Sequence, residues 1–290
     1  MFVVTGITGN TGAAAADALL HAGHRVRALV RDPAKAGSWA RKGVELITGD
    51  VMNREALRRA FEGASGAYIL VPPHPQHPDP VANATQVAQA VAQASRDAGL
   101  ERLVLLSSEG AHLPSGTGPI RGLHEAERIL AGAAPRLTYL RATYFQENWH
   151  SVFPVAREQG VLPTFLTDVN RPRPMVAARD IGRTAADLLT AADAPAIVEL
   201  KGPRDLTVVE AASIIGSALG RSVTPVQPPR EAWAGILMQA GLGQAYAKLL
   251  AEMYDGINSE HVRFEGVPDQ RRGPTELADT VASWTLAKAA

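Results

Sequence analysis

The first twelve residues constrain the fold more than any other part of the chain. The apolar, β-branched run MFVVT leads directly into GITGNTG, whose glycines are Gly6, Gly9 and Gly12, and the helix-forming run AAAADALL follows. This order predicts a buried strand, a tight turn and a helix whose third glycine lets it pack closely on the strand. The N–H groups of such a turn and the positive end of the helix dipole converge on one point. The stretch therefore predicts a pyrophosphate site, and the alternative is a glycine turn that binds nothing.

The composition favours a protein whose partners are small molecules. Among the 290 residues, Lys plus Arg and Asp plus Glu both total 29, which argues against a nucleic-acid partner. The length favours two modest domains, and the lack of cysteine excludes disulfides and thiolate sites. Met1 opens directly on the first strand and no apolar run is long enough to span a membrane. We therefore expect no leader, no membrane association and a cytoplasmic location.

Short apolar runs alternate with helical patterns along the first half of the chain. Predicted strands after the first cover 24–30, 44–48, 66–71, 102–107 and 136–141, and predicted helices include 53–61, 81–98 and 120–130. The run GAYILV at 66–71 is apolar throughout, which is typical of a central strand in a parallel sheet. The first half of the chain therefore predicts an α/β fold.

The end of the second strand predicts which dinucleotide the chain prefers. An acidic residue at this place binds ribose hydroxyls, whereas a basic residue accommodates a 2′-phosphate. Arg31 occupies the place, and Lys35 follows one helical turn later. Asp32 could be the acidic residue of an NAD site, but Asp before Pro33 is also the usual cap and first position of a helix. We predict that NADP is preferred over NAD.

Residues after the later strands are further candidates, because the carboxyl ends of parallel strands border the ligand crevice. Asp50 and Val51 follow the third strand, where the adenine would lie, although Asp50 equally suits a cap for helix 53–61. Ser107 ends the fifth strand beside the expected position of the reactive ring, or simply terminates that strand.

The loop PPHPQHPDP after the fourth strand raises the question of a metal site. His74 and His77 lie three residues apart, with Asp79 nearby. A third spaced ligand is not evident, and prolines keep the segment extended. We therefore predict a lid or substrate wall, and no metal.

The motifs TGITGNTG, VRDPAK, GD, LLSSEGAH and TYLRATYFQENW, in this order, resemble those of the NmrA-like group of atypical short-chain dehydrogenase/reductases. VAARDIGRTAADLL and LKGPRDLTVVEAASIIGSALGR also look like that group, so the resemblance covers most of the chain. Within the group the sequence is most similar to bacterial NADPH-dependent quinone reductases. The resemblance implies a Rossmann-type, doubly wound parallel sheet that binds NADP(H), with a smaller C-terminal α/β lobe over the nicotinamide.

The resemblance also implies where the cofactor would bind. The pyrophosphate would meet Gly6, Thr8, Gly9, Asn10, Thr11 and Gly12, and the 2′-phosphate would meet Arg31 and Lys35. Asp50 and Val51 would lie at the adenine, Val71 and Pro72 along the ribose, and Ser107, Tyr144 and Phe145 near the nicotinamide. Ala142 departs from the family, where proline commonly follows the arginine, so the ring contact at this place is less defined.

Catalysis departs further from the superfamily. Its standard members use a YxxxK pair to protonate the substrate carbonyl, but no tyrosine occurs between Tyr68 and Tyr139. His124 is the nearest match to a lysine or histidine that some relatives keep on this helix, although it lies three residues before Glu127 and the usual spacing is four. His124, Ser107 and Tyr144 are the candidate catalytic residues.

The missing pair leaves two functional hypotheses open. Quinones accept hydride readily, so positioning them beside NADPH supplies much of the catalysis, and water can deliver protons. We therefore predict an NADPH-preferring oxidoreductase acting on a small quinone or carbonyl acceptor. The alternative is a non-catalytic NADP(H) sensor of the NmrA type that binds a regulatory protein partner.

The pattern after residue 150 predicts a smaller lobe. It contains strands at 175–177, 196–200 and 222–226 and helices at 179–189, 207–220, 230–240, 244–254 and 274–288, with a capping box at Thr207 and Glu210. Trp233, Met238, Leu242 and Tyr246 either line an apolar pocket or form core, and Asn148, His150 and Asn170 are polar candidates near the crevice. We divide the chain into 1–150 and 151–290, with a soft boundary because later strands can return to the first sheet. A homodimer is compatible with the sequence.

Overall fold

The apolar run at the start of the chain forms β1 (Phe2–Thr5), an inner strand of an eight-stranded sheet in the computed structural model, which describes residues 1–286. The other strands of this sheet are β2 (Val26–Val30), β3 (Glu45–Thr48), β4 (Gly66–Leu70), β5 (Arg102–Ser108), β6 (Arg136–Ala142), β10 (Ile197–Lys201) and β13 (Gln270–Arg272). Their order is β13-β10-β6-β5-β4-β1-β2-β3, and every pairing is parallel. The chain direction across the sheet reverses between β1 and β4, where open α/β sheets bind ligands.

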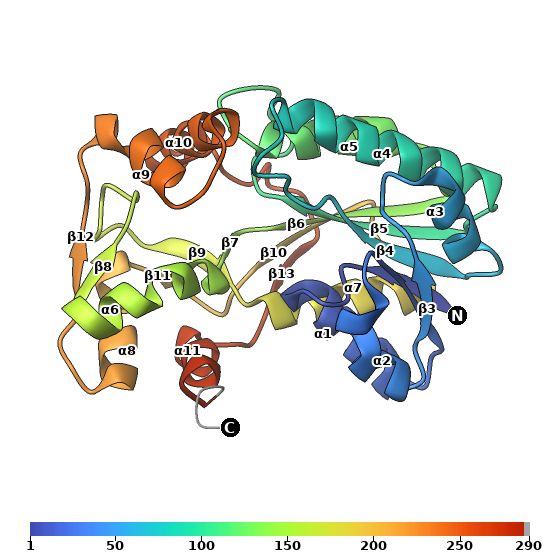
Figure 1. Ribbon diagram of the computed structural model, residues 1–290, viewed down its shortest axis with the longest axis horizontal. Helices are drawn as coiled ribbons and strands as arrows, with labels where there is room; N and C mark the ends of the chain where they lie inside the picture. Colours follow the sequence, from blue (N-terminus) through green and yellow to red (C-terminus); the bar gives the residue numbers. More distant parts are fainter. Residues whose placement is uncertain (287–290) are drawn as a thin grey trace.

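Helices cover both faces of this sheet (Figure 1). One face carries α3 (Arg54–Phe61), α4 (Pro80–Asp97) and α5 (Ile120–Leu130), and the other carries α1 (Asn10–His21) and α7 (Ala178–Thr190). A 3₁₀ turn, η1 (Pro33–Ala36), and the short α2 (Gly37–Arg41) connect β2 to β3. The predicted doubly wound, Rossmann-type sheet is confirmed.

Small residues let α1 and α7 approach each other closely beneath β1. A Cβ atom at Gly182 would lie 2.5 Å from the Cβ atom of Ala14 and 2.5 Å from the carbonyl oxygen of Thr11. Apolar side chains of both helices, including Leu19 and Ile181, are buried in the core on this face of the sheet. This contact fixes the first turns of α1, and with them the glycine turn.

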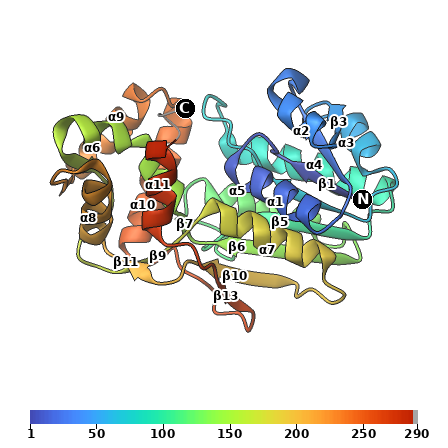
Figure 2. The same cartoon turned by 90° about the horizontal axis from the view of Figure 1, so that it is seen from below.

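The remaining elements form a second lobe beyond the carboxyl ends of the strands (Figure 2). They are β7 (Tyr144–Phe145), η2 (Gln146–Ser151), α6 (Phe153–Gln159), β8 (Val161–Pro163), β9 (Arg173–Val176), β11 (Asp205–Leu206), α8 (Val208–Leu219), β12 (Thr224–Val226), η3 (Arg230–Ala232), α9 (Trp233–Gln239), α10 (Gln244–Asn258) and α11 (Leu277–Leu286). The predicted capping box is confirmed, because Thr207 and Glu210 bond each other's backbone N–H at the start of α8. Trp149, Phe153 and Leu206 lie in the lobe's own apolar core.

The chain passes between sheet and lobe more than once. It enters the lobe after β6, returns to the sheet through α7 and β10, and returns again through β13, and the last described element is α11. The sequence did not predict β13, a polar strand of three residues whose only pairing in the sheet is with β10. The last predicted helix begins at Leu277 rather than Pro274, and its predicted end at Ala287 and Lys288 lies outside the described residues.

Candidate functional site

The glycine turn joins β1 to α1 at the point where the sheet order reverses. Gly6 has φ of +67°, a conformation that favours glycine, and its carbonyl oxygen accepts the N–H of Gly9 at 2.9 Å. A Cβ atom at Gly12 would lie 2.2 Å from that same oxygen, so only glycine fits there. Helix α1 begins at Asn10 without a side-chain cap, and its first N–H groups have no acceptor inside the helix. This arrangement suits an anion.

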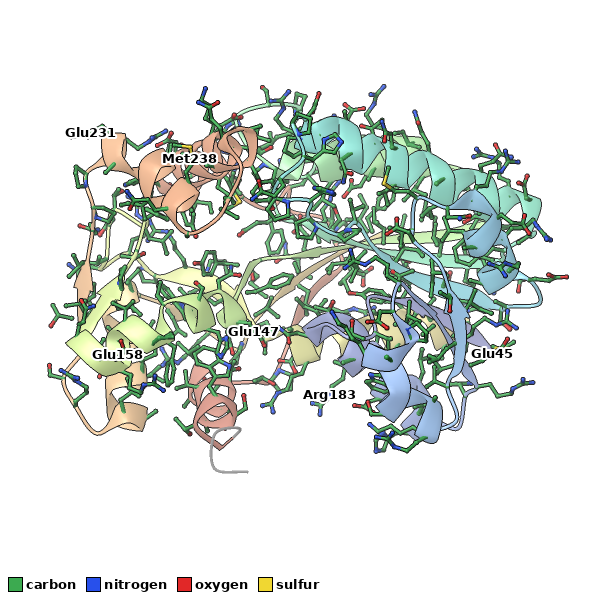
Figure 3. All side chains as sticks on the ribbon, in the orientation of Figure 1. Glu45, Glu147, Glu158, Arg183, Glu231 and Met238 are labelled. Atoms are coloured by element: carbon green, nitrogen blue, oxygen red, sulfur yellow. The ribbon has the colours of Figure 1, made fainter. Side chains whose placement is uncertain are left out.

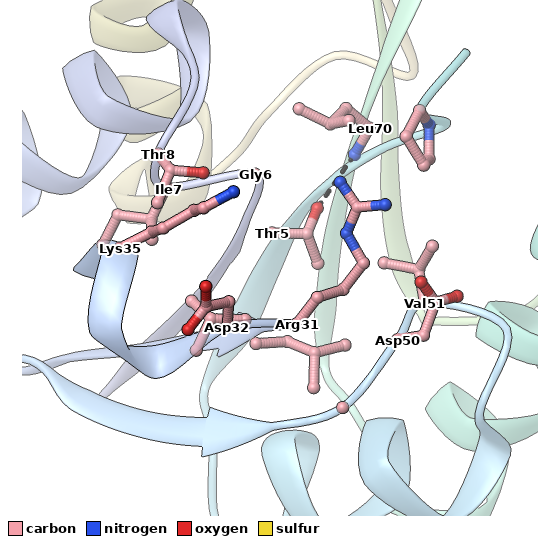
Figure 4. A pocket seen from close by; sticks show the side chains of 14 residues that line it. Thr5, Gly6, Ile7, Thr8, Arg31, Asp32, Lys35, Asp50, Val51 and Leu70 are labelled. Carbon is pink, nitrogen blue, oxygen red and sulfur yellow. Dashed lines mark hydrogen bonds between the residues drawn. The ribbon is translucent and has the colours of Figure 1, made fainter. Parts of the chain in front are cut away.

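A pocket of about 420 Å³ lies beside this turn (Figure 4). Its wall includes Gly6 and Thr8 from the turn, Arg31 directly after β2, Lys35 from η1, and residues after β3 and β4. Arg31 and Lys35 are exposed, and neither forms an ion pair with another of the described residues. Both cations are therefore available to an anionic ligand.

The two acidic residues of this pocket have structural partners. Asp32 accepts the N–H of Ala34 at 3.0 Å and caps η1, with Pro33 in its first turn, so the predicted cap is confirmed. Asp50 accepts the N–H of Met52 at 2.9 Å in a tight turn, whereas Asn53 caps α3. The alternative role of Asp50 as the cap of α3 is therefore wrong, because the helix starts three residues later than that role requires. Asp50 and Val51 both line the pocket.

The other residues predicted to bind the pyrophosphate fall into two groups, those that line a second pocket and those that line none. Gly9 and Asn10, together with Thr8, line a second pocket of about 490 Å³ between the turn, η2, α7 and α11, to which His150 also contributes. Thr11 is only 6% exposed and, like Gly12, lines none of the described pockets. Their contribution to an anion site would come from the backbone of α1.

Ser107 belongs to a buried ionic network at the end of β5. Its Oγ donates to Glu127 at 2.6 Å, and Arg141 binds the same carboxylate through Nε at 3.0 Å and Nη2 at 2.7 Å. Burial lowers the pKa of Arg141, but its bonds to Glu127 and Glu265 outweigh burial and raise it. Since the Ser107 proton is directed to Glu127, this serine cannot donate to a substrate without breaking the network.

His124 faces away from the described pockets. Its Nδ1 lies 2.8 Å from the carbonyl oxygen of Ala111, and the ring is half-buried. The preceding residue, Leu123, lines a pocket instead. The offset of one residue noted in the sequence therefore turns the imidazole by about 100° around α5 relative to a residue at the usual spacing.

Tyr144 and Phe145 form β7, directly beyond the end of β6, and pair with β9. The hydroxyl of Tyr144 lies 3.4 Å from that of Tyr254 on α10. Burial raises the pKa of both phenols, so both keep their protons at neutral pH. Tyr144 is the predicted catalytic residue that retains a hydroxyl not bound to a carboxylate.

The loop after β4 and the lobe line a third pocket, of about 210 Å³. Val71, Pro72 and His74 belong to it, and Pro72 also lines the pocket at the glycine turn. His74 and His77 stack edge to face at 5.4 Å. Within residues 1–286, no three His, Asp or Glu side chains gather closely enough to hold a metal ion. The same residues include no helix with the length and apolar character needed to cross a membrane.

Of the four apolar lobe residues singled out in the sequence, Tyr246 alone lines one of the described pockets. Trp233 is core at 2% exposure, where its ring packs on Phe165 and Tyr254. Met238 is exposed on α9 (Figure 3). Asn148 and Asn170 are exposed outside the described pockets.

Two carboxyl groups with unusual surroundings were not candidates in the sequence. Glu147, at the junction of η2 and α7 (Figure 3), accepts the N–H of Ala178 with both oxygens at 3.0 Å and lines the second pocket. Burial raises the pKa of Glu109, directly after β5, to about 8. The only sequence signal for Glu109 is its place after a buried strand.

The model of the NmrA-like family matches residues 1–283. The chain belongs to the NmrA-like family. The family resemblance predicted from the motifs is thereby confirmed.

Two curated relatives of this NmrA-like chain are reductases. It is 26% identical over 257 residues to an NAD(P)H azoreductase of Xenophilus azovorans, which covers 88% of this chain and 86% of that protein. It is 26% identical over 265 residues to quinone oxidoreductase 2 of Escherichia coli (strain K12), which covers 87% of this chain and 86% of that protein.

Solved structures agree with the fold of this NmrA-like protein. The Escherichia coli NADPH-dependent quinone oxidoreductase QOR2 in complex with NADPH matches with a TM-score of 0.80, at 23% identity, over 98% of this chain and 100% of that one. The Citrobacter sp. triphenylmethane reductase in complex with NADP(H) matches with a TM-score of 0.79, at 22% identity, over 98% and 99%. These neighbours are dinucleotide complexes of reductases that share the Rossmann-type sheet.

Proposed function

We propose that this protein is an NADPH-preferring reductase that transfers hydride to a small quinone or carbonyl acceptor. The observation that carries the proposal is the pair of exposed cations, Arg31 and Lys35, which line the same pocket as the Gly6 turn and form no ion pair within residues 1–286. The reductase names of the curated relatives support the reaction class.

The residues present fit a dinucleotide. The uncapped start of α1 provides N–H groups for a pyrophosphate, and Arg31 and Lys35 provide charge for a 2′-phosphate. Asp32 is used as a helix cap, which leaves the end of β2 without a free acidic ligand for ribose hydroxyls. Asp50 and Val51 form the wall at which the adenine would lie.

The chain's own groups orient the reactants more than they transfer protons. When bound, NADPH supplies a hydride, and with one proton from water a quinone becomes a hydroquinone as NADP⁺ forms. Because the product is aromatic, positioning the acceptor in a site that excludes bulk water accounts for much of the catalysis. Ser107 and His124 are bonded to Glu127 and Ala111, and the hydroxyl of Tyr144 is bonded to that of Tyr254, so the proposal takes the proton from water and requires none of the three as a donor.

The exposed apolar side chains of the lobe give little support to the sensor alternative. Ile236 and Met238 lie on α9, whereas Val209 and Val226 lie on α8 and β12. Figure 1 shows α9 and α8 at opposite ends of the lobe, so these side chains do not gather into one surface for a partner.

The test is NADPH consumption by the purified protein with a panel of quinones, aldehydes and ketones, alongside an NADPH titration. We expect tight NADPH binding and turnover with the quinones. Tight binding without turnover of any acceptor would favour the sensor, and no binding would overturn the whole proposal.

A further inference from the structure

The pocket of about 210 Å³ after β4 lies where an acceptor could meet the proposed dinucleotide. It is enclosed by the loop after β4, by α4, by the start of α5 and by α10, and it shares Pro72 with the pocket at the glycine turn. The two pockets therefore adjoin at Pro72. Typical ligand sites measure about 300–1,000 Å³, so this one suits a small molecule.

Most of the lining is apolar, but one buried polar side chain stands out. Asn83, on the inner face of α4, is 4% exposed and lines the pocket beside Leu123 and Tyr246. No side-chain hydrogen bond among the residues that the structure describes involves its amide, and the amide is not one of the fully buried groups that lack a partner, so it is open to the pocket. A ligand in the pocket can therefore bond to this amide without breaking a hydrogen bond inside the protein.

Two hydrogen bonds hold the loop after β4 against the lobe. The N–H of Gly243 donates to the carbonyl oxygen of Pro75 at 2.9 Å, and Gln76 Nε2 donates to the carbonyl oxygen of Gly241 at 2.5 Å. These bonds join the loop to the turn between α9 and α10, and Tyr246 lies in the first turn of α10. On the lobe side the pocket is therefore bounded by α10, whose start is hydrogen-bonded to the loop after β4.

We propose that this pocket binds the ring of the hydride acceptor and that the Asn83 amide donates a hydrogen bond to an oxygen on that ring. The inference rests on the proposed reductase function and narrows it to small, flat acceptors that carry oxygen. Leu123 and Tyr246 pack on the ring and set the size limit. Burial raises the pKa of the Tyr246 phenol, so it stays neutral beside an apolar ring.

The first test replaces the amide by an apolar group of similar size. With NADPH saturating, Asn83→Leu is expected to lower kcat/KM for 1,4-naphthoquinone by about tenfold, mainly through a higher KM, with NADPH affinity unchanged. The matched control is Gln86→Leu, an exposed amide on the same helix, which should behave as the parent. A folded Asn83→Leu protein with parental kcat/KM would overturn the inference.

A second test uses the size limit and does not depend on Asn83. Tyr246→Ala should raise kcat/KM for 9,10-phenanthrenequinone relative to 1,4-benzoquinone by about tenfold, because it removes one wall of the pocket. An unchanged preference would count against the acceptor site even if Asn83→Leu failed to fold. If the parent binds NADPH but reduces none of these quinones, the reductase function itself fails and the inference fails with it.

Discussion

At the scale of single residues, charge at the end of β2 governs which dinucleotide the protein should prefer. The carboxylate of Asp32 caps η1. The positive charges of Arg31 and Lys35, in contrast, form no ion pair within residues 1–286 and line the pocket. Because Asp32 is used as a helix cap, only the two cations remain at this place to bind a dinucleotide.

Replacing Arg31 by alanine should weaken NADPH binding while leaving NADH binding unchanged. A charge-assisted bond to the 2′-phosphate is worth about 1.5–3 kcal/mol, so we expect the Kd for NADPH to rise about 10- to 100-fold. The two Kd values can be measured by titration calorimetry. Arg25→Ala, at the opposite end of β2, is the matched control. Equal changes for NADPH and NADH would show that Arg31 does not bind the 2′-phosphate.

Glu109 should make the stability of the protein depend on pH. Burial, together with Asp205 and Glu199, raises its pKa to about 8, although Lys201 and the backbone of Tyr144 oppose the shift. The folded protein therefore keeps a proton that the unfolded chain releases near pH 4.5. The contribution of Glu109 to the free energy of unfolding is therefore fully present below pH 4.5 and is lost as the pH rises to about 8.

Glu109→Gln removes this titration while keeping a neutral polar group. The Tm of the variant should equal that of the parent near pH 5 and exceed it by a few degrees at pH 8.5, in thermal melts across this range. Glu101→Gln, at an exposed glutamate before β5, is the control and should follow the parent at every pH. A constant difference between Glu109→Gln and the parent at all pH values would refute the argument.

At the scale of elements, the turn between β1 and α1 depends on the absence of a side chain at Gly12. A Cβ atom there would lie 2.2 Å from the Gly6 carbonyl oxygen and 2.8 Å from that of Thr5, and neither backbone can move without shifting β1 or α1. Gly12→Ala should therefore destabilise the fold by about 1–3 kcal/mol and abolish NADPH binding. Denaturant unfolding and an NADPH titration measure the two effects.

A glycine elsewhere in the chain provides the control for this substitution. A Cβ atom at Gly235, inside α9, meets nothing within 4 Å, so Gly235→Ala should keep NADPH affinity and stabilise the protein by about 0.5–1 kcal/mol. If Gly12→Ala behaved like Gly235→Ala, the close packing of the glycine turn would not be needed for binding.

Elements with a strong local signal could be predicted from the sequence, and elements that depend on their neighbours could not. The apolar run before Gly6 and the helix formers after Gly12 predict β1 and α1 by themselves. In contrast, β13 has three polar residues and forms only because β10 offers a free edge. The same limit applies to side chains. The sequence predicts that Ser107 lies at the end of its strand, but it does not predict the hydrogen bond to Glu127, because that residue lies twenty positions away.

At the scale of the whole molecule, the central sheet is assembled from both halves of the chain. Beyond residue 150, β10 pairs with β6, and α7 packs on α1 with Ile181 and Leu189 fully buried. The nucleotide half of the protein therefore relies on segments that follow the lobe in sequence. Their return also places the lobe over the carboxyl ends of the strands, where the three pockets lie.

A fragment of residues 1–150 is therefore expected not to fold on its own. It would expose one whole face of α1 and the edge of β6, and unpaired edges of this kind aggregate. We expect circular dichroism to show no cooperative thermal transition for the fragment, whereas the full-length chain unfolds in one. A fragment extended through α7 and β10, to residue 202, restores both contacts and should regain part of the transition. A cooperative 1–150 fragment that binds NADPH would instead show that the nucleotide half is an independent domain.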